Sequence, residues 1–250
     1  MRAFREISFA VVILLFLVSC ERHFVVSKHS AERISVNASL PSDQEIINII
    51  QPYKDSIDEL MSVVIGNSAI SMSKGRPESL LGNLLGDLVL DKSKALTDNK
   101  VDFAILNYGG IRISTLPAGE ITVGKIYELM PFENKVLVLT LDGVTTLDLL
   151  HRIAKSGGWP MSGATFIIQN EKATSIKIAG ELFDINKDYL VAMPDYIANG
   201  GDKMTMLKDK PRKDLGILIR SMIIEYITEL AEEGISLSSK LDNRIIESYE

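Results

Sequence analysis

The chain has 250 residues, is 46% apolar and carries a net charge of −6 at neutral pH. This length and apolar content suffice for one good core, or for two small domains at most. Acidic and basic residues are mixed along the chain without a basic stripe, which argues against a nucleic-acid polymer as partner. A small anionic ligand is still possible, because a few placed arginines are enough to bind one.

The N-terminus has the pattern of an export signal. Two arginines within the first six residues precede ten consecutive apolar residues over 9–18. About 20 residues are needed to span a bilayer, and a charged start before a short apolar run is typical of a secretory signal. The run ends in LVSC, which resembles the lipobox of bacterial lipoproteins. The resemblance implies cleavage before Cys20 and lipid on its sulfur and new amino group; the alternative is an ordinary signal with an incidental cysteine.

Cys20 is the only cysteine, so no disulfide can form within the chain. Residues 21–40 are mostly polar and show no clear period, which indicates a tether. We therefore expect a signal peptide over 1–20, a tether over 21–40 and a domain over 41–250. The protein is expected to be exported and held at the cell envelope by the lipid on Cys20.

The domain is expected to begin with a helix. Ser42 and Glu45 have the spacing of a capping box, and apolar residues then recur at alternating steps of four and three from 46 to 60, which is one face of a helix. A strand over 62–70 follows. Residues 77–90 predict a second helix with its leucines on the buried side.

The middle of the chain alternates between strands and helices. VDFAIL, residues 101–106, is apolar without alternation, which predicts a strand covered on both faces. A short helix over 123–130 precedes a second buried strand over 135–141. A helix over 145–155 and a hairpin over 165–180 come next.

YLVAMP, residues 189–194, predicts another buried strand, and residues 215–232 predict a last long helix that ends at Gly234. Helices and strands alternate without internal repeats or low-complexity linkers. The chain from residue 41 onward is therefore expected to form one α/β domain.

Three loops of this domain combine glycine or proline with residues that can hold a ligand. NYGGIR contains Arg112, PFEN contains Phe132 and Asn134, and DYIANGGD contains Tyr196 and Asp202. Loops at the ends of sheet strands are where α/β proteins bind ligands. Taken singly, each residue also has an ordinary interpretation as a core aromatic, a turn cap or a surface ion-pair partner.

Together, these residues match the parts of a nucleotide. An aromatic ring stacks on a flat base, and an ionised carboxylate accepts hydrogen bonds from ribose hydroxyls. Arginine binds phosphate through its planar fork of N–H donors, and glycine lets the backbone approach a ligand closely. We therefore expect a nucleotide or nucleoside as ligand.

Four stretches in order carry a family resemblance: RPESLLGNLLGDLVLD, DFAILNYGGIR, AGEITVGKIYELMPFENKVLVLTLDG and YLVAMPDYIANGGD. They resemble the C-terminal domain of the 5′-nucleotidase / UDP-sugar hydrolase family over residues 76–202. The resemblance implies a single layered α/β/β/α domain that binds the substrate.

The resemblance also implies roles for single residues. The family's base-sandwiching aromatics fall on Phe132 and Tyr196, its base-contacting asparagine on Asn134, its ribose-binding aspartate on Asp202, its phosphate-facing arginines on Arg112 and Arg76, and a backbone-contacting glycine on Gly157. Two departures stand out. Glu133 replaces the usual glycine of the PFEN turn, and a second arginine expected shortly before Arg76 is missing, with Lys74 nearby.

The resemblance also implies that catalysis uses a two-metal centre and a His–Asp pair in an N-terminal domain, and we expect no such domain in this chain. Among its three histidines, two fall in the tether and His151 in a helix. We expect no cofactor in this chain and divalent metals only in a partner. The hypothesis is nucleotide hydrolysis carried out with a separate metallophosphoesterase chain. The alternatives are a non-catalytic nucleoside- or nucleotide-binding lipoprotein, and a domain that has kept its fold and lost its ligand.

Overall fold

The computed structural model describes residues 25, 28–35, 37, 40–98 and 100–248. The predicted signal peptide over 1–20, with Cys20 and its lipid, lies outside these residues. The chain divides into two units, residues 1–49 and 50–250. The described residues of the predicted tether form no helix or strand, and no helix in the described part of the chain is long and apolar enough to cross a membrane.

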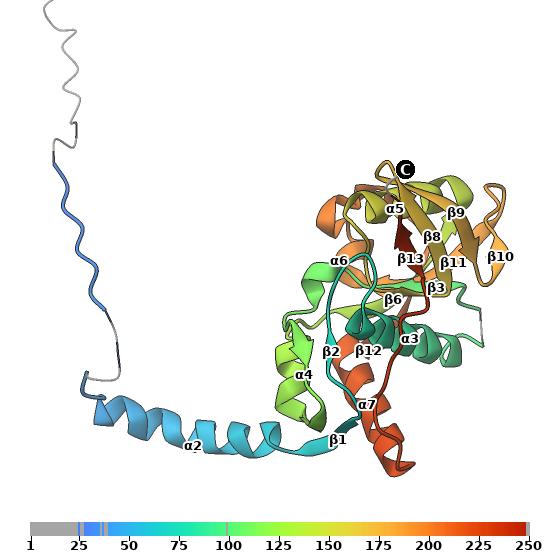
Figure 1. Cartoon of the computed structure of the whole chain (residues 1–250). Coiled ribbons are helices and arrows are strands. Elements are labelled where there is room, and N and C mark those ends of the chain that lie inside the picture. The colour runs from blue at the N-terminus through green and yellow to red at the C-terminus, as the bar shows by residue number, and fades with distance from the viewer. Residues whose placement is uncertain (1–24, 26–27, 36, 38–39, 99, 249–250) are drawn as a thin grey trace, which may run out of the picture. The chain divides into compact units, whose positions relative to one another are not determined.

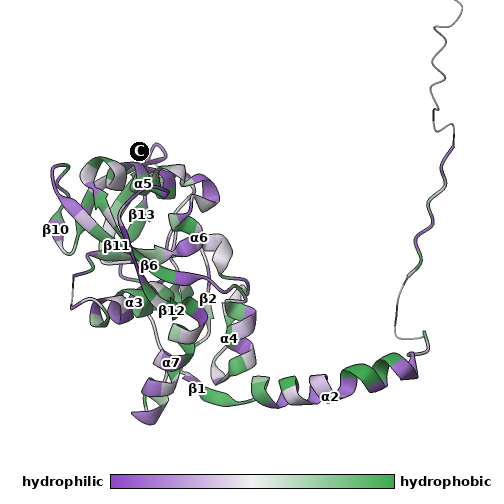
Figure 2. Cartoon of the chain, turned by 180° about the vertical axis from the view of Figure 1, so that it is seen from behind, coloured by the Kyte–Doolittle hydropathy of each residue, from purple (hydrophilic) through white to green (hydrophobic). Residues whose placement is uncertain are grey.

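Helix α2 (Gln44–Met61) confirms the first predicted helix. Its cap is Asp43 instead of Ser42, because the carboxylate of Asp43 accepts hydrogen bonds from the backbone N–H groups of Glu45 and Ile46 at 3.0 and 3.2 Å. No residue of α2 is buried. Hydrophobic and hydrophilic residues alternate along it, as Figure 2 shows.

A five-stranded sheet forms the centre of the second unit. Its strands, in spatial order, are β12 (Arg212–Leu218), β6 (Lys135–Asp142), β11 (Asp188–Pro194), β3 (Phe103–Ile105) and β7 (Met161–Ser162). Strand β11 runs parallel to β3 and antiparallel to β6. This arrangement brings the end of β11, the end of β3 and the beginning of β6 to one edge of the sheet.

Both faces of this sheet are covered, which explains the apolar strands without alternation. Along β6, Leu137 and Leu139 enter one hydrophobic core, whereas Val136 and Val138 enter the other. Successive residues thus face opposite cores, so residues 136–139 are all buried and offer no solvent-facing position for a polar side chain.

The layers on the two faces differ (Figure 1). One face packs on helices, namely α3 (Leu80–Ala95), α4 (Val123–Leu129) and α7 (Ile219–Glu232). The other packs on helix α5 (Gly143–Lys155) and a second sheet of β10 (Glu181–Leu182), β9 (Lys172–Ile178), β8 (Ala164–Gln169) and β13 (Ile245–Glu247). The predicted α/β fold with layered helices and sheets is confirmed.

Two small ribbons complete the strands: β1 (Val64–Ser68) pairs with β5 (Gly119–Thr122), and β2 (Met72–Ser73) pairs with β4 (Thr115–Leu116). The hairpin predicted over 165–180 is confirmed as β8 and β9, which pair antiparallel.

The prediction of a helix over 215–232 is wrong at its start. Residues 212–218 form the edge strand β12, paired with β6, and α7 begins only at Ile219. Gly216 has φ +71°, and its N–H donates to the side chain of Asp214 at 2.8 Å. A left-handed residue with a local side-chain hydrogen bond interrupts a helix, even though the apolar spacing through this segment is compatible with one.

Candidate functional site

The three predicted ligand loops meet because of the strand directions in the central sheet. Residues 107–112 follow β3 and residues 195–202 follow β11, which is parallel to β3. The PFEN turn, residues 131–134, precedes β6, which runs antiparallel to β11. Two strand ends and one strand beginning therefore share an edge, and their loops surround a common space.

That space is a cavity of about 320 Å³. It is lined by Asn107, Gly109, Gly110, Arg112, Phe132, Asn134, Tyr196 and Asp202. Five of the seven residues predicted to bind substrate thus lie in one cavity. Phe132 and Tyr196 are 44% and 46% exposed. Neither ring contacts the other within the described residues, so both leave apolar surface open to a flat ligand.

Tyr196 and Asp202 are held together locally. The Tyr196 hydroxyl donates to the Asp202 carboxylate at 3.0 Å, and it accepts the Asp202 backbone N–H at 3.3 Å. Asp202 has φ +49°, a left-handed conformation that costs a non-glycine residue roughly 1–2 kcal/mol. The turn between them needs glycine as well: a Cβ on Gly201 would lie 2.5 Å from the Tyr196 ring. The Tyr196 ring therefore packs directly against the backbone of Gly201.

Arg220, which the sequence did not single out, supports the PFEN turn. It is 7% exposed on α7, and its guanidinium donates to the carbonyl oxygens of Met130, Pro131 and Phe132 at 3.4, 2.9 and 3.3 Å. Glu133 lies 3.9 Å from the same guanidinium and does not line the cavity. The glutamate in place of the family's glycine therefore faces Arg220.

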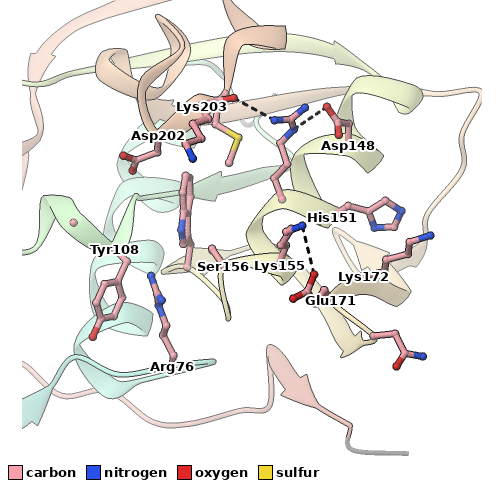
Figure 3. A pocket seen from close by; sticks show the side chains of 15 residues that line it. Arg76, Tyr108, Asp148, His151, Lys155, Ser156, Glu171, Lys172, Asp202 and Lys203 are labelled. Carbon is pink, nitrogen blue, oxygen red and sulfur yellow. Dashed lines mark hydrogen bonds and ion pairs between the residues drawn. The ribbon is translucent and has the colours of Figure 1, made fainter.

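A second cavity of about 860 Å³ adjoins the first and shares Gly109 and Asp202 with it. Arg76, the sixth predicted residue, lines this larger cavity beside Tyr108 (Figure 3). Trp159 is also part of its wall, although it is only 5% exposed and belongs to the hydrophobic core. The two predicted phosphate-facing arginines thus lie in neighbouring cavities.

Gly157, the seventh predicted residue, lines neither cavity. It has φ +82°, and a Cβ there would lie 3.4 Å from the Cδ of Arg76. Gly157 therefore lies next to the side chain of Arg76, which lines the larger cavity.

His151 lies in the wall of the larger cavity. Its Nδ1 accepts the backbone N–H of Ala173 at 3.1 Å, which ties β9 to α5. Burial and the nearby charge of Lys172 lower the pKa of His151. Across the described part of the chain, no group of three or more His, Cys, Asp or Glu side chains is arranged to hold a metal ion. The residues at this site do not fit a two-metal centre.

A family model described as the 5′-nucleotidase C-terminal domain matches residues 62–209. Among curated proteins, the chain is similar to Protein UshA of Escherichia coli strain K12, with 27% identity over 218 residues that cover 83% of this chain and 38% of that protein. It is also similar to the 5′-nucleotidase of Vibrio parahaemolyticus, with 26% identity over 191 residues that cover 72% of this chain and 33% of that protein.

The chain is also similar to solved structures that are described as 5′-nucleotidases. The 5′-nucleotidase precursor from Thermus thermophilus matches with a TM-score of 0.72 and 28% identity, over 84% of this chain and 44% of that chain. A Staphylococcus aureus structure described as a putative 5′-nucleotidase matches with a TM-score of 0.67 and 15% identity, which is a likeness of fold alone. The chain spans less than half the length of these relatives.

Proposed function

Because the chain belongs to the 5′-nucleotidase C-terminal domain family, we propose that it recognises a nucleotide for hydrolysis by a separate metallophosphoesterase chain. Phe132 and Tyr196 hold the base between them, and Asn134 contacts its edge. Asp202 accepts from the ribose hydroxyls.

The observation that carries this proposal is the gathering of these four side chains in one cavity, from loops up to 70 residues apart. Two half-exposed rings give a base two apolar faces, each worth about 1–3 kcal/mol in stacking. Asp202 is fixed by the Tyr196 hydroxyl, so ribose recognition and base recognition share one rigid turn. Arg112, whose Cζ lies 5.7 Å from the centroid of the Phe132 ring, provides a cation beside the base site.

The partner chain follows from the chemistry that phosphate esters need. Their hydrolysis is extremely slow without catalysis, and metal-bound water is the nucleophile that two-metal sites provide. Among the described residues, no group of three or more His, Cys, Asp or Glu side chains is arranged to hold a metal ion. We propose that the partner brings the metal ions and the water, while this chain holds the base, the ribose and the phosphate.

Binding is tested first, by calorimetry of the purified chain with adenosine and with AMP. Phe132→Ala and Tyr196→Ala should each weaken adenosine binding. Tyr53→Ala is the matched control, because Tyr53 is 71% exposed and lies outside the cavity. Adenosine binding that neither cavity variant weakens would overturn the base site.

Catalysis is tested by mixing the chain with metallophosphoesterases that lack this domain, AMP and a divalent metal. Phosphate release that depends on both chains and is abolished in Phe132→Ala and Tyr196→Ala supports the split enzyme. Ligand binding without such release favours the non-catalytic binder instead.

We also propose that the chain is exported and anchored through lipid on Cys20. Labelled fatty acid should be incorporated into the wild-type protein in a bacterial host but not into Cys20→Ala. Incorporation that persists in the variant contradicts the anchor site.

A further inference from the structure

The turn that carries Asp202 has an unfavourable backbone conformation. Gly200, Asp202 and Lys203 have φ values of +90°, +49° and +67°. The left-handed region suits glycine, but Asp202 and Lys203 are two successive residues with a Cβ in it. Such a segment keeps one conformation only where the contacts around it determine that conformation. We call residues 200–204 the ribose turn, because under the proposed function Asp202 accepts hydrogen bonds from the ribose hydroxyls.

Short-range contacts fix part of the ribose turn. Gly201 packs against the Tyr196 ring, whose hydroxyl accepts the Asp202 N–H at 3.3 Å. Met204 is 2% exposed in the hydrophobic core, and its N–H donates to the Gly201 carbonyl oxygen at 3.0 Å. The Lys203 carbonyl belongs to the same peptide group as this N–H. Because the two groups of a trans peptide point in opposite directions, the carbonyl oxygen faces away from Gly201 and is open to a partner outside the turn.

Arg152 is that partner. Its Nη1 donates to the Lys203 carbonyl oxygen at 3.2 Å, and its Nε donates to the Asp148 carboxylate at 3.0 Å (Figure 3). Arg152 belongs to helix α5, which is anchored in the core by the fully buried Leu149 and Ile153. The guanidinium is planar, and its donors point in fixed directions. The bond to Asp148, one helical turn earlier, therefore orients the donor that reaches the ribose turn.

We propose that Arg152 is a positioning residue that holds the ribose turn in the conformation in which Asp202 receives the ribose. This inference rests on the proposed function and adds to it a residue of α5, which contributes none of the seven predicted substrate contacts. Hydrogen bonds weaken steeply when their geometry is distorted, and one oxygen of Asp202 already accepts the Tyr196 hydroxyl at 3.0 Å. A small rotation of the ribose turn is therefore enough to weaken the contact with the ribose hydroxyls. Arg152 thereby determines the selectivity for a sugar with free hydroxyls.

The ion pair of Arg152 with Asp148 has little weight in the stability of the fold. The two side chains are 42% and 44% exposed, and exposed ion pairs contribute little. Asp148 also compensates the charge of Arg152, which leaves hydrogen bonding to the Lys203 carbonyl as the main effect of the guanidinium on the turn. Arg152→Ala should therefore fold as wild type does.

The experiment measures by calorimetry the affinity for adenosine relative to the affinity for 2′,3′-dideoxyadenosine. Both ligands carry the same base, but only adenosine has the hydroxyls that Asp202 is proposed to bind. This hydroxyl selectivity should fall about three- to tenfold in Arg152→Ala, the factor expected for one charge-assisted hydrogen bond at a partly exposed position. The affinity for dideoxyadenosine and the thermal unfolding midpoint should stay near the wild-type values, which a general loss of structure would not allow.

Two variants separate positioning from charge. Lys155→Met is the matched control, because Lys155 lies on the same helix and lines the same larger cavity but pairs with Glu171, 3.5 Å away, instead of the ribose turn. It should keep the wild-type selectivity, and a loss as large as that of Arg152→Ala would contradict positioning. Arg152→Lys keeps the charge but lacks the fork of donors, so its selectivity should lie between those of Arg152→Ala and wild type.

A double-mutant cycle shows whether Arg152 acts through Asp202. Asp202→Gly removes the carboxylate and suits the φ of +49° at this position. In this background Arg152→Ala should lower the hydroxyl selectivity no further, because residues that act through one contact are not additive. A further loss equal to that in the wild-type background would show that Arg152 acts by another route.

Hydroxyl selectivity that stays at the wild-type value in Arg152→Ala would overturn this inference and leave the ribose contact of the proposed function in place. Failure of the wild-type chain to bind either nucleoside, or to prefer adenosine over dideoxyadenosine, would instead overturn the ribose part of the proposed function and this inference with it.

Discussion

Gly201→Ala should weaken base binding without removing any group that contacts the base. The new Cβ would lie 2.5 and 2.6 Å from Cε1 and Cζ of Tyr196, and 2.6 Å from its carbonyl oxygen. Ordinary carbon–carbon contacts are about 3.5–4.0 Å, so the ring has to move by roughly 1 Å. The displaced ring also carries the hydroxyl that donates to Asp202.

Two effects follow from this displacement. Overpacking should reduce the free energy of unfolding by about 1–3 kcal/mol. Loss of part or all of one stacking face, about 1–3 kcal/mol, should weaken adenosine binding roughly 5- to 150-fold.

Thermal unfolding measures the first effect and calorimetry with adenosine measures the second. Gly75→Ala is the matched control, because its Cβ would make an ordinary contact of 3.5 Å with Ser79. Gly75 lies near Lys74 and Arg76, but adenosine carries no phosphate, so a change at these cations should not alter its binding. If Gly201→Ala binds adenosine as tightly as wild type while Tyr196→Ala does not, the idea that Gly201 sets the ring position is refuted.

Three further predictions concern other parts of the domain. Asp202→Gly removes the carboxylate from a residue with φ +49°, so thermal stability should be equal or higher, by about 1 kcal/mol, while adenosine affinity falls; a clear loss of stability would contradict this. Arg244→Leu leaves the carboxylate of Asp87, now 2.7 Å from the guanidinium, without its cation. Because the Asp87 side chain is 41% exposed, water screens the pair, and the free energy of unfolding in urea should fall by about 1–3 kcal/mol; an unchanged value would contradict this. The hydrogen bond from Lys210 is the main cause that lowers the pKa of Asp142. The stability that this shift contributes is present above the unfolded-state pKa of about 4 and is lost as pH falls below it. Asp142→Asn should therefore show a smaller decrease in urea midpoint between pH 7 and pH 3 than wild type, and equal decreases would disprove the assignment.

The central sheet could be predicted because burial on both faces leaves a clear trace in the sequence. Residues 103–106 and 136–139 are consecutive apolar residues without alternation, and strands between two cores need such runs. The edge strand β12 could not be recognised in the same way. Its identity depends on pairing with β6, and its apolar residues continue in helical spacing into α7.

The cavity residues could be predicted from the loops, but the residues that hold them could not. Arg220 contacts the PFEN turn from almost 90 positions later in the chain, and nothing in the local spacing around it indicates that contact. Tyr108 also lies in NYGGIR, but the sequence pattern there indicates a role only for the glycines and Arg112. Its contacts with Lys74 and Arg76 come from a segment about 30 residues earlier, so only the folded chain reveals them.

Away from the cavity, aromatic rings and cations of this domain have partners within the protein. Phe183 and Tyr189 stack with centroids 5.5 Å apart, and the Arg244 guanidinium is paired with both Asp87 and Asp242. The opposite holds for the two rings in the cavity at the shared edge of the central sheet, because Phe132 and Tyr196 stay nearly half exposed. Lys74, which is half-buried, has its pKa lowered by its burial and by the charges of Arg112 and Arg76. Folding alone gains nothing from exposed apolar rings or from cations that repel one another. Under the proposed function, both costs are offset when a ligand with a flat apolar face and a dianionic group binds, as a nucleotide monophosphate would.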